Sequence, residues 1–170
     1  IAVIGASNKV GSVGNEVMKR LKNGGFDGRV YPINPHEKEI EGYKVFKNVL
    51  DVHKPIELAI IAVPAINVIK VVEECHKSDI INVIVVSNGF KEAGVEGARL
   101  EKALVDRIEH YKMHMIGPNC VGVVNTNENA LAEFTKAIEL KDDDAMMHNN
   151  KGVVLKLMEK YELSLKELDR

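Results

Sequence analysis

Five short apolar runs, separated by longer stretches with helical spacing, constrain the possible fold of this chain more than any other feature. The runs are rich in valine and isoleucine and mostly lack polar alternation: Ile1–Ile4, Val30–Ile33, Leu58–Val63, Val83–Val86 and His114–Ile116. Such runs are typical of strands buried on both faces of a parallel sheet. Apolar residues recur at spacings of three and four in Val13–Asn23, Ile66–His76 and Gly97–Tyr111, which predicts helices. The order predicts a doubly wound α/β domain from Ile1 to Thr126.

Small or polar turn residues follow each predicted strand. Right-handed crossovers bring the carboxyl ends of parallel strands to one edge of the sheet, and ligands bind along that edge. None of these turns carries Asp, Glu or His, so we expect the edge to present backbone amides and neutral hydrogen bonds. The turn residues, in chain order, are Gly5, Ala6, Ser7 and Asn8; Asn34 and Pro35; Pro64 and Ala65; Ser87, Asn88, Gly89 and Phe90; and Gly117, Pro118, Asn119 and Cys120.

The first of these turns is a glycine-containing loop that leads into a helix. Its glycines are Gly5, Gly11 and Gly14, and five residues separate the first two where the dinucleotide pattern G-x-G-x-x-G has one. Asn34 stands where a nicotinamide site has an acidic residue, which counts against NAD. Gly11-Ser12-Val13 replaces the G-K-[ST] of a triphosphate loop. The helix start still suits a phosphate, and the alternative is a glycine-rich turn that binds nothing.

Five segments carry a specific resemblance when taken in order and at their separations. They are "IAVIGASNKVGSVGNEVMKRL", "GRVYPINP", "IELAIIAVPA", "VVSNGFKEAG" and "MIGPNCVGVVNT". Together they resemble the CoA-binding domain of the alpha subunit of ADP-forming acetyl-CoA synthetase, a domain shared with the succinyl-CoA synthetase alpha subunit. The resemblance covers about residues 1–126, as a Rossmann-like domain.

The resemblance implies roles in binding coenzyme A for the turn residues. The loop from Gly5 to Gly11, with Ala6, Ser7 and Asn8, would cradle the phosphates. Asn34 and Pro35 would flank the adenosine, and Lys38 would meet the 3′-phosphate. Pro64, Ala65 and the run Ser87, Asn88, Gly89 and Phe90 would line the pantetheine path, with Asn119 and Cys120 near the thiol.

Several of these residues have a purely structural alternative. Cys120 can be a small packing residue, Lys38 a solvated surface lysine, and Asn119 the residue that closes its turn. Cys75 shares a helix face with valines and is predicted to lie in the core. The six histidines show no metal or triad arrangement, so we assign no catalytic residue and no metal site.

Composition limits the partners and the setting. A net charge of −2 provides no broad basic field, so we expect neither nucleic acid nor a membrane as a partner. No apolar run approaches the roughly 20 residues of a membrane span. Two cysteines without metal or redox spacing fit a cytoplasmic location. Because Ile1 already belongs to a predicted core strand, we expect the chain to begin inside a longer protein.

Residues 127–170 differ in composition and resemble tetratricopeptide repeats, whose period is 34 residues. Ala130 and Ser164 are separated by that period, as are Phe134 and Leu168. We predict helices over Glu128–Leu140, Asp144–Met158 and Glu159–Asp169. The alternative is an ordinary helical hairpin packed on the α/β domain.

The resemblance implies a CoA-binding module of an acetate–CoA type synthetase. The complete enzyme would convert acyl-CoA, ADP and phosphate into acid, ATP and CoA, with an ATP-grasp-type beta subunit or domain as partner. This chain alone is expected to be inactive, because its strand ends offer no phosphoryl carrier and no ADP site. The alternative is a non-catalytic sensor of CoA or nucleotide whose helical tail docks a protein partner. A nicotinamide oxidoreductase is disfavoured by Asn34.

Overall fold

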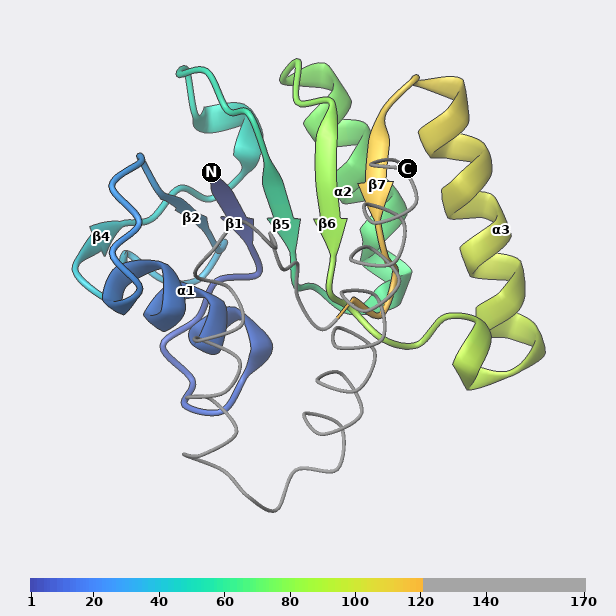
Figure 1. Cartoon of the computed structure of the whole chain (residues 1–170), viewed down its shortest axis with the longest axis horizontal. Coiled ribbons are helices and arrows are strands. Elements are labelled where there is room, and N and C mark those ends of the chain that lie inside the picture. Colours follow the sequence, from blue (N-terminus) through green and yellow to red (C-terminus); the bar gives the residue numbers. More distant parts are fainter. Residues whose placement is uncertain (121–170) are drawn as a thin grey trace, which may run out of the picture. The chain divides into compact units, whose positions relative to one another are not determined.

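The structure is a computed structural model that describes residues 1–120. Its main sheet has five parallel strands in the order β2-β1-β5-β6-β7 (Figure 1). The strands are β1 (Ala2–Ile4), β2 (Tyr31–Ile33), β5 (Ala59–Ile61), β6 (Asn82–Val85) and β7 (His114–Ile116). The helices are α1 (Val13–Asn23), α2 (Ala65–Lys77) and α3 (Val95–His110). The predicted parallel α/β fold is therefore confirmed for these residues, with element ends that differ by at most two residues.

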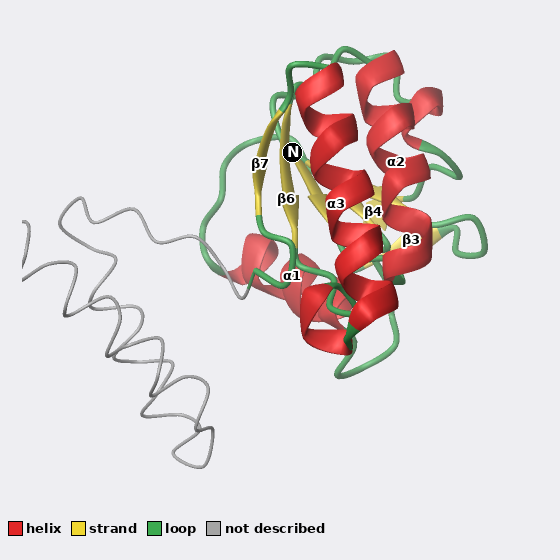
Figure 2. Cartoon of the chain, turned by 90° about the vertical axis from the view of Figure 1, so that its right-hand side faces the viewer, coloured by secondary structure: helices red, strands yellow, loops and turns green. Residues whose placement is uncertain are grey.

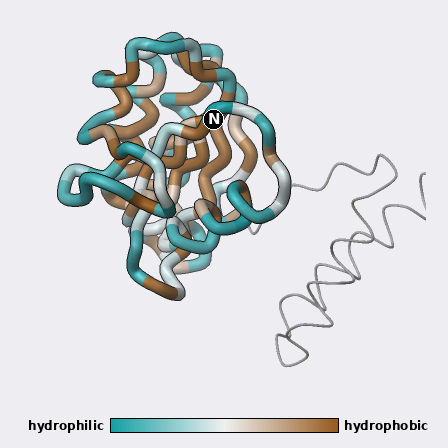
Figure 3. Tube along the Cα trace, turned by 90° about the vertical axis from the view of Figure 1, so that its left-hand side faces the viewer, coloured by the Kyte–Doolittle hydropathy of each residue, from teal (hydrophilic) through white to brown (hydrophobic). Residues whose placement is uncertain are grey.

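The helices cover both faces of the sheet. Helices α2 and α3 lie on one side of the strands and α1 lies on the other (Figure 2). Apolar residues concentrate in the central strands, and the outer loops are hydrophilic (Figure 3). This layering explains why the strand sequences lack polar alternation, since both sheet faces are in contact with helices.

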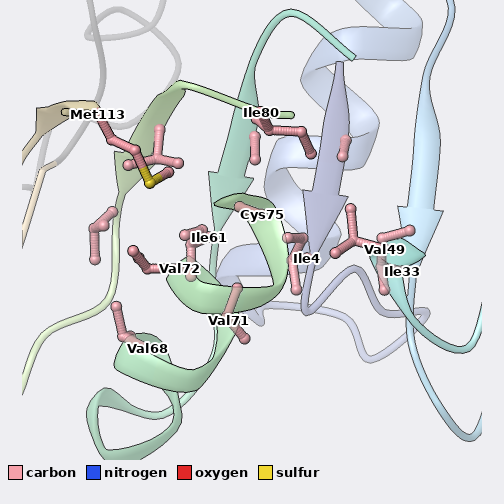
Figure 4. Packing of buried hydrophobic residues seen from close by; sticks show 14 of the residues in the cluster. Ile4, Ile33, Val49, Ile61, Val68, Val71, Val72, Cys75, Ile80 and Met113 are labelled. Atoms are coloured by element: carbon pink, nitrogen blue, oxygen red, sulfur yellow. The ribbon is translucent and has the colours of Figure 1, made fainter. Parts of the chain in front are cut away.

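The larger core lies between the sheet and α2. Val68, Val71, Val72 and Cys75 form the buried face of α2 and pack toward the sheet, where Ile61 of β5 lies (Figure 4). Burial, assisted by the neighbouring Glu74 carboxylate, raises the pKa of the Cys75 thiol to about 12. Cys75 is therefore a core residue, as predicted, and stays a neutral thiol at physiological pH.

A small hairpin after β2 was not predicted. Strands β3 (Glu39–Ile40) and β4 (Tyr43–Lys44) are joined by Glu41 and Gly42, whose φ angles of 50° and 87° suit a tight two-residue turn. Strands of two residues are too short to show a period. Ile40 is fully buried in the second core cluster together with Met18 of α1. This packing holds the segment after β2 against the middle of α1.

Two single 3₁₀ turns complete the described fold. They are η1 (Val49–Asp51) and η2 (Lys91–Ala93). η1 begins at Asn48, whose side chain accepts from the Leu50 N–H at 2.9 Å. η2 directly precedes α3 and follows Phe90, which is fully buried in the main core cluster. The predicted helices beyond residue 126 lie outside the described residues.

Replacement of Phe90 by alanine tests this core. Deleting a fully buried ring removes transfer energy and leaves a cavity, so we expect Phe90→Ala to lower the free energy of unfolding by about 3–5 kcal/mol. Phe26 is 40% exposed and provides a matched control, with an expected loss below about 1 kcal/mol. Urea denaturation measures both. Equal losses for the two variants would contradict the assigned burial.

Candidate functional site

The loops that follow β1, β5, β6 and β7 all leave the sheet at its carboxyl edge, toward which the arrows of Figure 1 point. The sequence-predicted turn residues of these strands lie along this edge. The turn after β2 is hydrogen-bonded to the loop between β1 and α1, because the Asn34 side-chain amide donates to the Ala6 carbonyl at 2.8 Å. The edge therefore brings together residues from widely separated parts of the chain.

Two glycines allow close backbone contacts at the end of β1, Gly14 with α1 and Gly5 with the chain after β5. A Cβ built on Gly14 would collide with the Gly5 carbonyl, and a Cβ built on Gly5 would collide with the Ala62 carbonyl. Gly5 also has a φ of 90°, which L side chains rarely adopt. The helix can start directly beside the end of β1 because Gly14 lacks a side chain, and the lack of one at Gly5 leaves room for the backbone that follows β5.

Two asparagines hold the loop between β1 and α1 in shape. The Asn15 side chain, almost fully buried in the first turn of α1, donates from Nδ2 to the Ser7 carbonyl at 3.0 Å. Asn34 donates to the Ala6 carbonyl, while its Oδ1 accepts from the His36 N–H at 2.8 Å. Sequence reasoning placed Asn34 at the adenosine and did not identify Asn15, whose signal is a polar residue on the buried face of an amphipathic helix.

The start of α1 offers backbone donors to an anion. Ser12 caps the helix: its hydroxyl accepts from the Asn15 N–H at 3.3 Å. Within residues 1–120, the N–H groups of Gly11, Val13 and Gly14 have no hydrogen-bond acceptor. Gly11 has a φ of 79°, and a Cβ built there would meet nothing within 4 Å. Open donors at the positive end of a helix dipole form an anion site.

Two carboxylates reach the edge, which differs from the neutral edge that we expected. Glu37 accepts hydrogen bonds from the Ser7 hydroxyl at 3.1 Å and from the Asn8 N–H at 3.0 Å. Glu92 accepts from the Gly89 N–H at 2.6 Å and the Phe90 N–H at 3.2 Å. The expectation failed because it considered only the residues directly after each strand, whereas the chain folds these two back from a few positions further on.

The residues predicted to bind the phosphates of coenzyme A differ in their contacts within the described part of the chain. Ser7 and Asn8 already donate to Glu37. Lys38 is exposed and forms no ion pair in the described part of the chain, while its carbonyl accepts from the Val45 N–H at 3.1 Å. Pro35 is exposed next to Asn34.

The residues predicted to line the pantetheine path lie at the ends of β5, β6 and β7. Pro64, Ala65, Asn88 and Gly89 are exposed or half-buried. The Ser87 hydroxyl donates to the Ile61 carbonyl at 3.4 Å and is buried. The Phe90 ring belongs to the core, so only the backbone of this position borders the edge.

The final turn is tied to β6 by its backbone. The Asn119 N–H donates to the Ser87 carbonyl at 2.9 Å, and the Cys120 N–H donates to the Val85 carbonyl at 3.2 Å. Asn119 has a φ of 55°, which fits the role of closing a turn. Cys120 is half-buried.

Exposed apolar side chains also gather at the carboxyl edge, a feature that the sequence analysis did not identify. Val10 and Val13 flank the first loop and are 79% and 53% exposed. Ile66, in the first turn of α2, is 76% exposed, and Val95, at the start of α3, is 71% exposed. The edge is therefore amphipathic, with amide donors at the first loop and apolar side chains further along.

Other site types are not found in residues 1–120. This part of the chain contains no group of three His, Cys, Asp or Glu side chains arranged to hold a metal ion. None of its helices is long and apolar enough to cross a membrane. A hollow of about 420 Å³ lies at the opposite, amino-terminal edge of the sheet, lined by His53, Lys54, Pro55, Ile56, Ser78 and Asp79. None of the predicted ligand residues lines it.

A parallel, doubly wound sheet whose first loop presents open amides at a helix start defines a nucleotide-binding domain of the Rossmann-like class. Comparison with known proteins narrows this class. The chain belongs to the family described as the CoA binding domain, whose model matches residues 1–126. This match confirms the resemblance deduced from the five sequence segments.

Several of the similar proteins are acetate–CoA ligases. The chain is 43% identical over 159 residues to acetate–CoA ligase [ADP-forming] I of Archaeoglobus fulgidus, covering 94% of this chain and 23% of that protein. It is 45% identical over 134 residues to the alpha subunit of acetate–CoA ligase [ADP-forming] II of Pyrococcus furiosus, covering 79% and 29%. The alignment to the Archaeoglobus protein continues past residue 126, into the segment that resembles tetratricopeptide repeats.

A solved structure shows the same fold. The dinucleotide-forming acetyl-coenzyme A synthetase 1 of Ca. Korarchaeum cryptofilum, in complex with phosphate and ADP, superposes with a TM-score of 0.67 at 37% identity. The match covers 71% of this chain and 26% of that chain. The chain thus spans about a quarter of the length of the relatives that it matches.

The hydrogen bonds to Glu92 predict a pH-dependent turn. Its own backbone N–H and that of Gly89 hold the pKa of this exposed carboxyl below the usual 4.5. Stabilisation of the turn is therefore complete above pH 4.5 and is lost as the pH falls through the lowered pKa. We expect the Gly89 amide resonance to titrate with a midpoint below 4.5, and Glu92→Gln to abolish this titration. A midpoint at or above 4.5 would contradict the assigned bonds.

Proposed function

We propose that this chain is the CoA-binding module of an ADP-forming acyl-CoA synthetase of the acetate–CoA ligase type. The observation that carries the proposal is the loop between β1 and α1, where the N–H groups of Gly11, Val13 and Gly14 have no hydrogen-bond acceptor within residues 1–120. This loop lies within the region matched by the CoA binding domain family. The family match and the geometry of the loop both support coenzyme A as the ligand.

The described residues fit the chemistry of coenzyme A. Its diphosphate suits the amides at the start of α1, where the helix dipole favours negative charge. Lys38, exposed and without an ion pair in residues 1–120, suits the 3′-phosphate. The pantetheine arm is long and partly apolar, and Ile66 beside Pro64 and Ala65 offers an exposed apolar contact along its path.

The complete protein would perform the synthetase reaction, in which acyl-CoA, ADP and phosphate give acid, ATP and CoA. The relatives named above are about four times longer than the aligned region, and one of them is called an alpha subunit. A partner of the ATP-grasp type would supply the ADP site. We infer that this chain binds CoA and catalyses no turnover by itself. We also infer that the protein acts in the cytoplasm.

The role of residues 127–170 remains a prediction. These residues lie outside the described part, and the reading as tetratricopeptide-like helices that dock a partner rests on their sequence pattern. The similarity to the Archaeoglobus ligase extends into this segment and favours a place for it within the synthetase over a separate sensor module.

Isothermal titration calorimetry of the 170-residue chain tests the proposal. CoA should bind more tightly than NAD or ATP. NAD is the most informative ligand to compare with CoA, because the Glu37 carboxylate lies beside the loop. In nicotinamide sites an acidic residue near this loop binds the ribose hydroxyls. Tighter binding of NAD than of CoA would refute the proposed ligand.

A comparison of CoA with dephospho-CoA tests whether Lys38 binds the 3′-phosphate. If Lys38 meets the 3′-phosphate, Lys38→Ala should weaken CoA binding by about 1.5 kcal/mol and leave dephospho-CoA binding unchanged. Lys77, in the last turn of α2 at the opposite edge, is the control, and Lys77→Ala should leave the affinities for both ligands unchanged. Equal loss of affinity for CoA and dephospho-CoA in the Lys38 variant would show that Lys38 does not meet the 3′-phosphate, and no loss for either ligand would remove Lys38 from the site.

Gly11 and Gly25 form a matched pair that separates stability from binding. Their φ angles are 79° and 74°, and a Cβ built on either meets nothing within 4 Å. Each alanine variant should therefore lose about 1–2 kcal/mol of stability. Only Gly11→Ala should also weaken CoA binding, because Gly11 belongs to the loop. If both variants bind CoA like the parent chain once they are shown to be folded, the loop is only a turn.

A further inference from the structure

We propose that Glu37 is a built-in occupant of the anion-binding loop, which coenzyme A displaces when a phosphate binds. The identity of the displacing ligand rests on the proposed function. The contact between Glu37 and the loop does not, since it is present in the protein alone.

The loop encloses the Glu37 carboxylate with donors from two consecutive residues. The Ser7 hydroxyl donates to Oε1 at 3.1 Å. The Asn8 N–H lies 3.0 Å from Oε1 and 3.3 Å from Oε2, and the Asn8 side-chain amide donates to Oε2 as well. Both carboxylate oxygens are thus bound by the loop that is predicted to bind phosphate.

No cation neutralises this carboxylate within residues 1–120. The ion pairs of the described part involve Glu41, Glu74, Glu96 and Glu73, and none involves Glu37. Among residues 1–120, the negative charge of Glu37 is therefore balanced by hydrogen-bond donors of the loop and by no ion pair. A loop that holds a half-buried carboxylate in this way has the donor set that an oxyanion needs.

The chain after β2 is folded so that Glu37 reaches the loop. The turn at Asn34, closed by the His36 N–H, directs the segment back toward β1. The Asn8 side chain also donates to the Glu39 carbonyl at 2.7 Å, which fixes the backbone on the far side of Glu37. The Glu37 carboxylate is therefore positioned by contacts of the Asn34 and Asn8 side chains with the backbone on either side of it.

A ligand phosphate at these donors cannot share them with Glu37. Two negative oxyanions within a few ångströms repel each other, and the Asn8 N–H can serve only one of them fully. The Glu37 side chain has rotatable bonds that let it leave the loop without moving the backbone. In the protein without ligand, the Glu37 carboxylate thus holds the loop in its shape. It also lowers the affinity of the loop for an incoming phosphate.

Neutral and shortened variants test the proposal by calorimetry with CoA on the 170-residue chain. Glu37→Gln removes the charge and should bind CoA about three- to tenfold more tightly than the parent chain. Glu37→Asp keeps the charge but shortens its reach, and should show a smaller gain. Glu39→Gln changes the net charge equally at an exposed side chain outside the loop, and should stay within about twofold of the parent chain.

The outcomes separate displacement from the other roles of Glu37. Affinity of Glu37→Gln equal to that of Glu39→Gln would overturn the proposal, because the carboxylate would then not compete. Weaker binding by Glu37→Gln, with circular dichroism showing a folded chain, would also overturn it and make Glu37 a lasting ligand contact.

A second readout does not depend on coenzyme A. In amide NMR spectra of the same chain, inorganic pyrophosphate should shift the Asn8 resonance, with a tighter apparent affinity in Glu37→Gln than in Glu39→Gln. If CoA does not bind but pyrophosphate behaves in this way, the proposed function fails and the role of Glu37 stands. An Asn8 resonance that responds to neither ligand in any variant would overturn the role of Glu37.

Discussion

The close contact between Gly14 and the Gly5 carbonyl is the constraint on which the rest of this structure depends. It lets α1 begin directly beside the end of β1, the second strand of the sheet, which lies between β2 and β5. From that position the buried Met18 packs on Val3, and the helix start points its open amides along the carboxyl edge. A side chain at Gly14 would collide with the Gly5 carbonyl and separate the helix from the strand, which would disrupt both the packing of α1 and the arrangement of the amides at its start.

The shape of the loop is maintained by side chains that satisfy its polar backbone groups. Asn15 and Asn34 bind the Ser7 and Ala6 carbonyls, while Glu37 takes the Asn8 N–H. Glu92 does the same for the turn after β6. Partnered amides keep a loop in one conformation. The donors left open at the helix start are therefore presented in a fixed arrangement, which lowers the ordering cost of binding a ligand.

The carboxyl edge combines a polar surface and an apolar surface, as a long ligand with an anionic end and a partly apolar arm requires. Amides and Lys38 lie at the first loop, and the exposed side chains of Ile66 and Val95 lie at the starts of α2 and α3. This distribution supports coenzyme A, whose nucleotide end is anionic and whose arm is partly apolar. Since the chain spans about a quarter of its relatives, the chemistry at the thiol end is expected to involve parts of the longer protein.

The sequence by itself determined the parallel strands, the three helices and the edge where the turn residues meet. These follow from local patterns, such as the stripe of Val13–Asn23 and the valine-rich runs, which reflect burial on both sheet faces. Only the tertiary structure decided that the Phe90 ring enters the core, that β3 and β4 pair, and that Glu37 closes on Asn8. Each of these depends on where the chain folds back after a strand. The strands β3 and β4 are too short to show a period, and the contact of Glu37 with Asn8 across 29 residues leaves no motif in the sequence around either residue.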